Sequence, residues 1–387
     1  MSKKFLIGQL ACYGDCLFAT TIAKQIRHDY PDSHITWAVS SKYRSIVEHN
    51  PDIDKIWEID VPGNDFYDAG WNNFEKEARA KKESGEFDEI IFSQIHPLNW
   101  VNFTGTIRGT ILSAYNKPIT VSKDPVVLLT VAEEENVLQF SKKNNLKNFK
   151  HVILFECAPG SAQSELTPEF ALAIAKSITA KHQNVCFILS TPDKTDFNNS
   201  QIIDASVLSF KENAALTHYC TLLIGCSSGI TWLSTATASK KLPMIQLLQK
   251  KGPIFAGVNF DFEINKIDNS NVMELLEYDE KKIEKVLNDY FNKGFGGIKS
   301  AYHQNYKPGY YYLMKNIRAL INQGKPREDI FKMIKLYKSA VGKFPINYFD
   351  MFYQIFIYGA INSENKFIRF LKNLVKPLLW KKQKPVF

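Results

Sequence analysis

The chain has 387 residues, of which 45% are hydrophobic and 23% charged, a composition typical of a folded globular protein and not of a disordered chain. No run of 18 apolar residues suggests a membrane-spanning helix, and the length is sufficient for two domains with separate cores. The net charge of +8 is uneven, because residues 288–387 carry +13 and residues 1–287 carry −5. Basic character therefore belongs to the C-terminal region, which could meet anionic partners or form a solvated helical face.

Six cysteines are present, and none of them forms a CxxC pair: Cys12, Cys16, Cys157, Cys186, Cys220 and Cys226. This spacing indicates neither a disulfide framework nor a metal site, so we expect reduced, partly buried thiols and a cytoplasmic protein. A secretory signal is a poor interpretation of the apolar start, because an acidic residue interrupts it.

The first 130 residues alternate between strand and helix patterns. Strands are predicted at residues 5–10, 35–39, 55–59 and 89–93. Helical spacing separates most of them, which favours a parallel sheet covered by helices.

The stretch "FLIGQLACYGDCLFATTIAKQI" opens this pattern. A strand leads through a glycine turn into a helix with apolar residues at Leu17, Ile22 and Ile26. Asp15 falls at the helix entrance. It is either a capping residue or a carboxylate that accepts the proton of an attacking hydroxyl.

Between the third and fourth strands lies "PGNDFYDAGWNNFEKEARAKKESGE". Its aromatic residues Phe66, Tyr67 and Trp71 either contact a substrate or belong to a surface loop followed by a charged helix. Both interpretations remain open from the sequence.

A second alternation follows a polar helix at about residues 132–145. Strands are predicted in "HVILFE", "VCFILS", "TLLIG" and "LPMIQLL". Two small-residue loops, "APGSAQSELTPEF" and "IGCSSGITWLSTATA", follow predicted strands. In open α/β sheets ligands bind beyond the carboxyl ends of strands, so both loops are candidate ligand sites.

The second of these loops carries the strongest phosphate-type pattern. Small residues at Ser227, Ser228 and Gly229 precede a helix that begins near Ile230, so that backbone N–H groups could bind a diphosphate. A plain serine N-cap is the alternative. Gly160 and Ser161 repeat this arrangement before a helix predicted to start near Pro168.

Several common catalytic motifs are absent. The sequence has no HExxH, GxSxG, Walker A or GxGxxG motif. His96, His218 and His303 are isolated, and no acidic cluster indicates a divalent metal, so we expect neither a metal nor a bound cofactor.

Three ordered motifs resemble one family. Residues 11–60, "ACYGDCLFATTIAKQIRHDYPDSHITWAVSSKYRSIVEHNPDIDKIWEID", are similar to the N-terminal signature of the lipopolysaccharide heptosyltransferases and related family 9 glycosyltransferases. The two small-residue loops resemble that family's two C-terminal-domain loops, in the same order. The resemblance covers about residues 3–290.

The resemblance implies an α/β protein of the GT-B fold, with two Rossmann-like domains facing a cleft. The aromatic, basic and helical character of the chain after Asp289 predicts a helical, basic C-terminal extension. The predicted division is residues 1–145 for the acceptor, 146–290 for the nucleotide sugar and 291–387 for the extension. The resemblance further implies an inverting, metal-independent transfer from a nucleotide-diphosphate sugar, such as a heptose donor, to a cell-envelope glycan or lipopolysaccharide acceptor.

The resemblance also implies roles for single residues. Asp15 would be the catalytic base, with Gly14 beside it, and Ser161 after Gly160 would contact the donor phosphates. The main donor loop would comprise Ser227, Ser228, Gly229, Ile230 and Thr231.

Two positions depart from the family pattern. Glu165 replaces a frequent lysine, and Ser227 and Trp232 stand where an acidic residue and a histidine are common. An altered donor or lost activity would each explain this. The alternatives are therefore a non-catalytic nucleotide-sugar or glycan-binding protein, or a GT-B sugar epimerase.

The closing stretch "NKFIRFLKNLVKPLLWKKQKPVF" has an apolar stripe flanked by basic residues. It predicts either a helix on the anionic inner face of a membrane or a tail helix packed on the protein. The preceding "FPINYFDMFYQIFIYGAI" would pack against the domains or add a second aromatic membrane contact. A nucleic-acid partner is not expected, because no nucleic-acid-binding module is recognisable.

Overall fold

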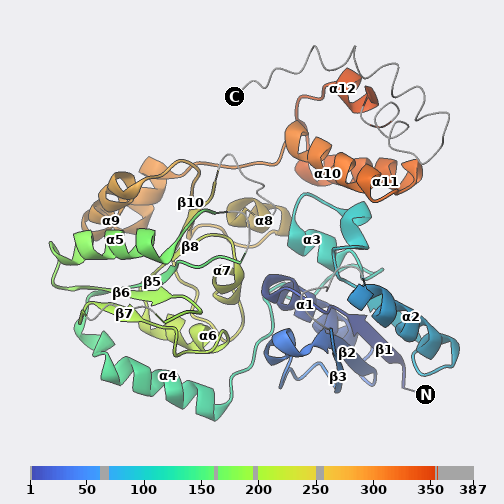
Figure 1. The fold of residues 1–387 in the computed structure, drawn as a ribbon, viewed down its shortest axis with the longest axis horizontal. Helices are drawn as coiled ribbons and strands as arrows, with labels where there is room; N and C mark the ends of the chain where they lie inside the picture. The colour runs from blue at the N-terminus through green and yellow to red at the C-terminus, as the bar shows by residue number, and fades with distance from the viewer. Residues whose placement is uncertain are drawn as a thin grey trace. The chain divides into compact units, whose positions relative to one another are not determined.

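The computed structural model describes residues 2–61, 69–160, 164–194, 199–249, 257–353 and 355. The chain divides into two compact units. The first unit comprises Met1–Asn99 and Thr106–Lys307 and contains both β-sheets, and the second comprises Trp100–Gly105 and the chain from Pro308 onwards. Figure 1 shows the two sheets and the helices around them.

The first sheet has four parallel strands in the order β3-β2-β1-β4. These strands are β1 (Lys4–Gly8), β2 (His34–Ser40), β3 (Lys55–Ile59) and β4 (Glu89–Phe92). They correspond to the four strands predicted from alternation. The helix α1 (Tyr13–Asp29) follows β1, and α3 (Ile107–Leu112) packs beside it.

The helix α2 (Ala69–Glu83) covers the other face of this sheet. Trp71 is fully buried there among the side chains of Leu6, Ala38 and Phe74, and its indole N–H donates to Glu75 Oε2 at 2.9 Å. Trp71 is therefore a core residue, so the interpretation as a substrate contact is wrong for it, whereas the charged helix of the other interpretation is present as α2. Phe66 and Tyr67 lie outside the described residues.

The second sheet has six parallel strands in the order β10-β9-β8-β5-β6-β7. Four were predicted: β5 (His151–Glu156), β6 (Val185–Ser190), β8 (Leu222–Gly225) and β9 (Met244–Leu247). The short strands β7 (Ile202–Asp204) and β10 (Val272–Leu275) were missed. With β5 counted as the first strand, this is the strand order of the dinucleotide-binding fold. The direction in which successive strands are added reverses between β5 and β8, which is the switch point of the sheet.

Six helices accompany the second sheet. They are α4 (Val131–Lys143), α5 (Pro168–Thr179), α6 (Glu212–Leu216), α7 (Gly229–Leu233), α8 (Val258–Asn265) and α9 (Glu280–Tyr302). The predicted start at Pro168 is confirmed, and the Thr167 side chain caps that helix by accepting from the Phe170 N–H. α5 packs against α9 over the buried side chains of the sheet.

The second unit contains α10 (Tyr310–Asn322), α11 (Arg327–Val341) and α12 (Tyr348–Phe352). α10 and α11 bury their apolar faces against each other, and Phe103 joins their core beside Tyr312 and Tyr337. The three-domain division at residues 145 and 290 remains a prediction.

None of the six cysteines is in a disulfide, and five of them are buried, whereas Cys12 is half-buried. Within the ranges that the structure describes, no helix is both long and apolar enough to cross a membrane.

Candidate functional site

The N-terminal turn of α1 carries Asp15. Cys12 occupies the N-cap position with φ of 71°, and its side chain makes no capping bond, so Asp15 is the third residue of the helix and not its cap. Asp15 is half-buried, and desolvation of its carboxyl group raises its pKa to about 7. No described residue forms a hydrogen bond or ion pair with it. A desolvated, unpaired carboxyl group with such a pKa is a candidate general base.

The N-terminal turn of α7 carries the predicted donor loop. Ser228 is its N-cap residue, but its side chain makes no capping bond. Ser227 has φ of 54°, in the left-handed region that is uncommon for serine. Cys12 and Ser227 thus place a positive φ just before α1 and α7 respectively, and such backbone strain is frequent at functional sites.

A buried carboxylate holds this loop. Glu156, the last residue of β5, accepts hydrogen bonds from the Ile230 N–H at 2.9 Å, the Cys226 N–H at 3.2 Å and the Thr231 hydroxyl at 2.6 Å. Burial raises the pKa of Glu156, and these three donors oppose that rise. The α7 terminus therefore already binds an anionic group supplied by the protein.

Gln246 of β9 supplies a second acceptor. Its Oε1 accepts from the Ser227 N–H at 2.8 Å and lies 3.2 Å from the Thr231 hydroxyl. The side chains of Ser227 and Thr231 are 1% and 0% exposed. These two predicted ligand residues therefore face the interior, where Glu156 and Gln246 fix the loop conformation.

The structure brings the first turns of α1 and α7 together. The two helices lie side by side (Figure 1), and a Cβ atom on Gly14 would lie 3.4 Å from the Trp232 ring. Trp232 is buried and packs edge-on against Phe18 of α1, with ring centroids 4.9 Å apart. The predicted base and the predicted donor loop therefore adjoin each other, although they are more than 200 residues apart in sequence.

An aromatic pair covers this junction. The rings of Tyr13 and Phe210 stack with centroids 4.1 Å apart. A Cβ atom on Gly229 would lie 2.8 Å from the Phe210 ring and 3.7 Å from Tyr13 Cβ, so only glycine leaves room for this ring. Ser228 and Gly229 are half-buried and are the accessible part of the loop, whereas Ile230 is buried.

The other predicted donor loop follows β5, on the other side of the switch point. Gly160 is exposed, and a Cβ atom there would meet nothing within 4 Å. Ser161 lies outside the described residues. Glu165, which replaces the family's lysine, has an exposed side chain.

Sequence reasoning missed an ion pair that joins the two halves of the first unit. Arg108 of α3 donates to Asp261 of α8 at 2.8 Å, and both side chains are 1% exposed. The guanidinium also donates to the Lys123 carbonyl at 2.7 Å and lies over the Phe18 ring at 4.6 Å from its centroid. A buried arginine in a helix of the first half and an acid in the second carry no local signal of pairing.

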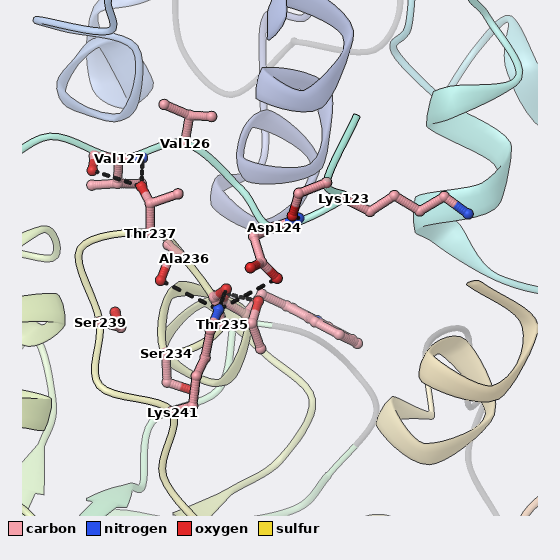
Figure 2. Close-up of polar contacts among 12 residues, drawn as sticks. Lys123, Asp124, Val126, Val127, Ser234, Thr235, Ala236, Thr237, Ser239 and Lys241 are labelled. Atoms are coloured by element: carbon pink, nitrogen blue, oxygen red, sulfur yellow. Dashed lines mark hydrogen bonds and ion pairs between the residues drawn. The ribbon is translucent and has the colours of Figure 1, made fainter. Parts of the chain in front are cut away.

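Residues 124–127, which lie between α3 and α4, form hydrogen bonds and an ion pair with the chain that follows α7. Figure 2 shows Thr237 exchanging two 3.1 Å hydrogen bonds with the Val127 backbone, and Lys241 Nζ lying 3.4 Å from Asp124. The Val126 N–H donates to the Thr20 hydroxyl of α1 at 2.8 Å. The segment is therefore bonded both to α1 and to the chain that follows the candidate donor loop.

In the part of the chain that the structure describes, no three His, Cys, Asp or Glu side chains are grouped as a metal site requires.

Comparison with known proteins identifies the fold. No family model and no curated protein sequence matches the chain. A family 9 glycosyl transferase from Veillonella parvula superposes with a TM-score of 0.54 at 17% identity, over 78% of this chain and 95% of its own. The Escherichia coli ADP-heptose lipopolysaccharide heptosyltransferase II gives 0.50 at 12% identity, over 75% of this chain and 99% of its own. The predicted α/β architecture is therefore confirmed, and the chain has the GT-B fold of these two glycosyltransferases.

Proposed function

We propose that this chain is a glycosyltransferase that moves a sugar from a nucleotide-diphosphate sugar to a cell-envelope glycan or lipopolysaccharide acceptor. The observation that carries the proposal is the unpaired carboxyl group of Asp15, with a pKa raised to about 7, beside the loop before α7. A base with a pKa near the working pH is the most effective proton acceptor, because it is both deprotonated and basic.

In the proposed reaction the oxygen of an acceptor hydroxyl attacks the anomeric carbon of the donor. The hydroxyl proton passes to Asp15, the bond from the anomeric carbon to the diphosphate oxygen breaks, and the nucleoside diphosphate leaves. Attack from the face opposite the leaving group inverts the anomeric configuration. The reaction needs no metal if protein groups stabilise the diphosphate.

The hydrogen bonds to Glu156 reduce the set of groups that are available to bind the diphosphate. Since the Ile230 N–H and the Thr231 hydroxyl are already bonded to Glu156, the proposed phosphate contacts are Ser228 and Gly229, together with the loop at Gly160 across the switch point. The fold similarity to an ADP-heptose heptosyltransferase makes an ADP-linked heptose the first donor to test.

The test is sugar transfer from a panel of nucleotide sugars to lipopolysaccharide core acceptors, with and without a chelator. We expect chelator-resistant transfer with release of the nucleoside diphosphate. Strict dependence on added divalent metal would contradict the metal-independent mechanism, and conversion of the donor without acceptor would instead identify an epimerase.

A second candidate, a non-catalytic nucleotide-sugar-binding protein, is favoured by the Glu156 contacts, the exposed Glu165 and the buried Trp232. These features reduce the cationic and N–H groups available to a diphosphate. Calorimetry that shows nucleotide binding without turnover for any acceptor would favour this candidate.

A further inference from the structure

The second unit holds every strongly exposed aromatic side chain among the described residues. They are Tyr311 of α10, Phe331 of α11, and Tyr348, Phe349 and Phe352 of α12, with exposed fractions from 47% to 82%. Exposed aromatic rings confined to one unit are typical of an interaction surface, because single exposed apolar residues are normally scattered over a protein.

The exposed face of α11 is basic. Phe331, Lys335 and Lys338 recur at helical spacing on it, with Lys332 beside them, and all four side chains are exposed. None of the three lysines forms an ion pair with a described residue. A groove of about 380 Å³ lies on this face and is lined by Phe331, Ile334, Lys335, Lys338 and Ser339. It combines apolar atoms with ammonium groups.

Hydrogen bonds attach both α12 and α11 to the N-terminal end of α10. The Tyr310 hydroxyl donates to the Asn347 carbonyl at 2.7 Å and lies 3.0 Å from Asp350, which holds α12 at the start of α10. The Tyr337 hydroxyl donates to the Gly309 carbonyl at 3.0 Å, which brings the last turns of α11 to the same place. The start of α12 and the C-terminal half of α11 therefore both adjoin the N-terminal end of α10, in one region of the unit.

We propose that this region, formed by the exposed aromatic residues and the basic face of α11, docks on an anionic phospholipid bilayer. Residues 308–355 contain eight Lys and Arg against three Asp and Glu, so the charge complements an anionic surface. Aromatic side chains favour the membrane interface, and lysine stems cover apolar groups while their ammonium ends meet phosphate. The proposal does not depend on the enzymatic activity.

The test is sedimentation of the full chain with vesicles of phosphatidylcholine mixed with phosphatidylglycerol, and with vesicles of phosphatidylcholine alone. The variant Lys332→Glu/Lys335→Glu/Lys338→Glu should bind the anionic vesicles roughly 100-fold more weakly, because each basic residue near the surface contributes substantially to affinity. The matched control is Lys142→Glu/Lys143→Glu/Lys147→Glu, which makes the same charge change at exposed lysines of the first unit. This control should lose much less affinity for the anionic vesicles.

A second pair of variants tests the aromatic contribution. Phe349→Ser should weaken binding several-fold, whereas Val131→Ser, at a residue that is equally exposed at 82%, should not. Equal losses in the two lysine variants, equal binding to both vesicle types, or no binding by the wild type would overturn the proposal. A wild-type dimer on size-exclusion chromatography that Phe349→Ser dissociates would assign the surface to a second copy, and would also overturn it.

Discussion

Asp15 and Glu156 are two buried carboxyl groups beside neighbouring helix N-termini, and they differ in their partners. Burial raises the pKa of both. Glu156 accepts three hydrogen bonds from the loop before α7 and from its first turn, whereas Asp15 has no partner among the described residues. A carboxylate with three donors stabilises a loop, and a desolvated carboxyl group without donors is available to exchange a proton.

Glu156 therefore has a structural role and Asp15 a chemical one, although both lie beside adjoining helix N-termini. These different roles predict that Asp15 affects turnover with little effect on stability, and that Glu156 affects stability first. Variants of the two residues should therefore give opposite patterns in the same pair of assays.

The largest expected effect is on turnover. Asp15→Asn should lower the rate of transfer by about 10²- to 10⁴-fold, because the amide cannot accept the hydroxyl proton. Nucleotide affinity by calorimetry and the circular dichroism spectrum should stay near those of the wild type. Unchanged turnover in this variant would leave Asp15 with no catalytic role.

The next effect is on stability. Glu156→Leu should lower the free energy of unfolding by about 3 kcal/mol, because it leaves the buried N–H groups of Cys226 and Ile230 and the Thr231 hydroxyl without an acceptor. Urea denaturation measures this loss, and Glu156→Gln, which keeps one oxygen, should lose less. A Glu156→Leu variant as stable as Asp15→Asn would contradict the structural role.

The pH dependence should follow Asp15. Because its pKa is about 7, transfer should fall about tenfold per pH unit below that value as the carboxylate becomes protonated. The folded state binds this proton more tightly than the unfolded chain, so Asp15 lowers the free energy of unfolding as pH rises from the ordinary carboxyl range towards 7. Melting temperatures of the wild type and Asp15→Asn should therefore diverge across this range. Parallel curves would mean that Asp15 has an ordinary pKa.

The smallest effect concerns the accessible part of the donor loop. Gly229→Ala should weaken nucleotide binding by roughly fivefold, about 1 kcal/mol, because the new methyl group would displace the Phe210 ring over the loop. Gly296→Ala in α9 is the matched control for adding a methyl group, since that exposed position has open space and lies outside the proposed donor site, so nucleotide affinity should stay at the wild-type value. If a folded Gly229→Ala variant has the nucleotide affinity of the wild type by calorimetry, the donor site does not lie at the start of α7.

Much of the fold could be predicted from the sequence, because its signals are local. Alternating strand and helix patterns located eight of the ten strands of the two sheets, and proline marked the start of α5. β7 was missed because a three-residue strand is too short to show a period, and β10 because charged residues interrupt and follow its short apolar run in "NVMELLEYDE". The position of Asp15 in the first turn of the helix after β1 could also be predicted, since a glycine turn between a strand and a helix is a local feature.

Only the tertiary structure decided what each of these residues does. The sequence left Trp71 either as a substrate contact or as part of a surface loop and charged helix, and the structure buries it in α2 on the first sheet. The donors on Glu156 and the pairing of Arg108 with Asp261 join residues at least 70 positions apart. Periodicity and turn chemistry report the conformation of neighbouring residues, whereas the partner of a buried charge depends on which distant strands and helices pack together. That packing gives Glu156 three donors and leaves Asp15 without a partner among the residues that the structure describes.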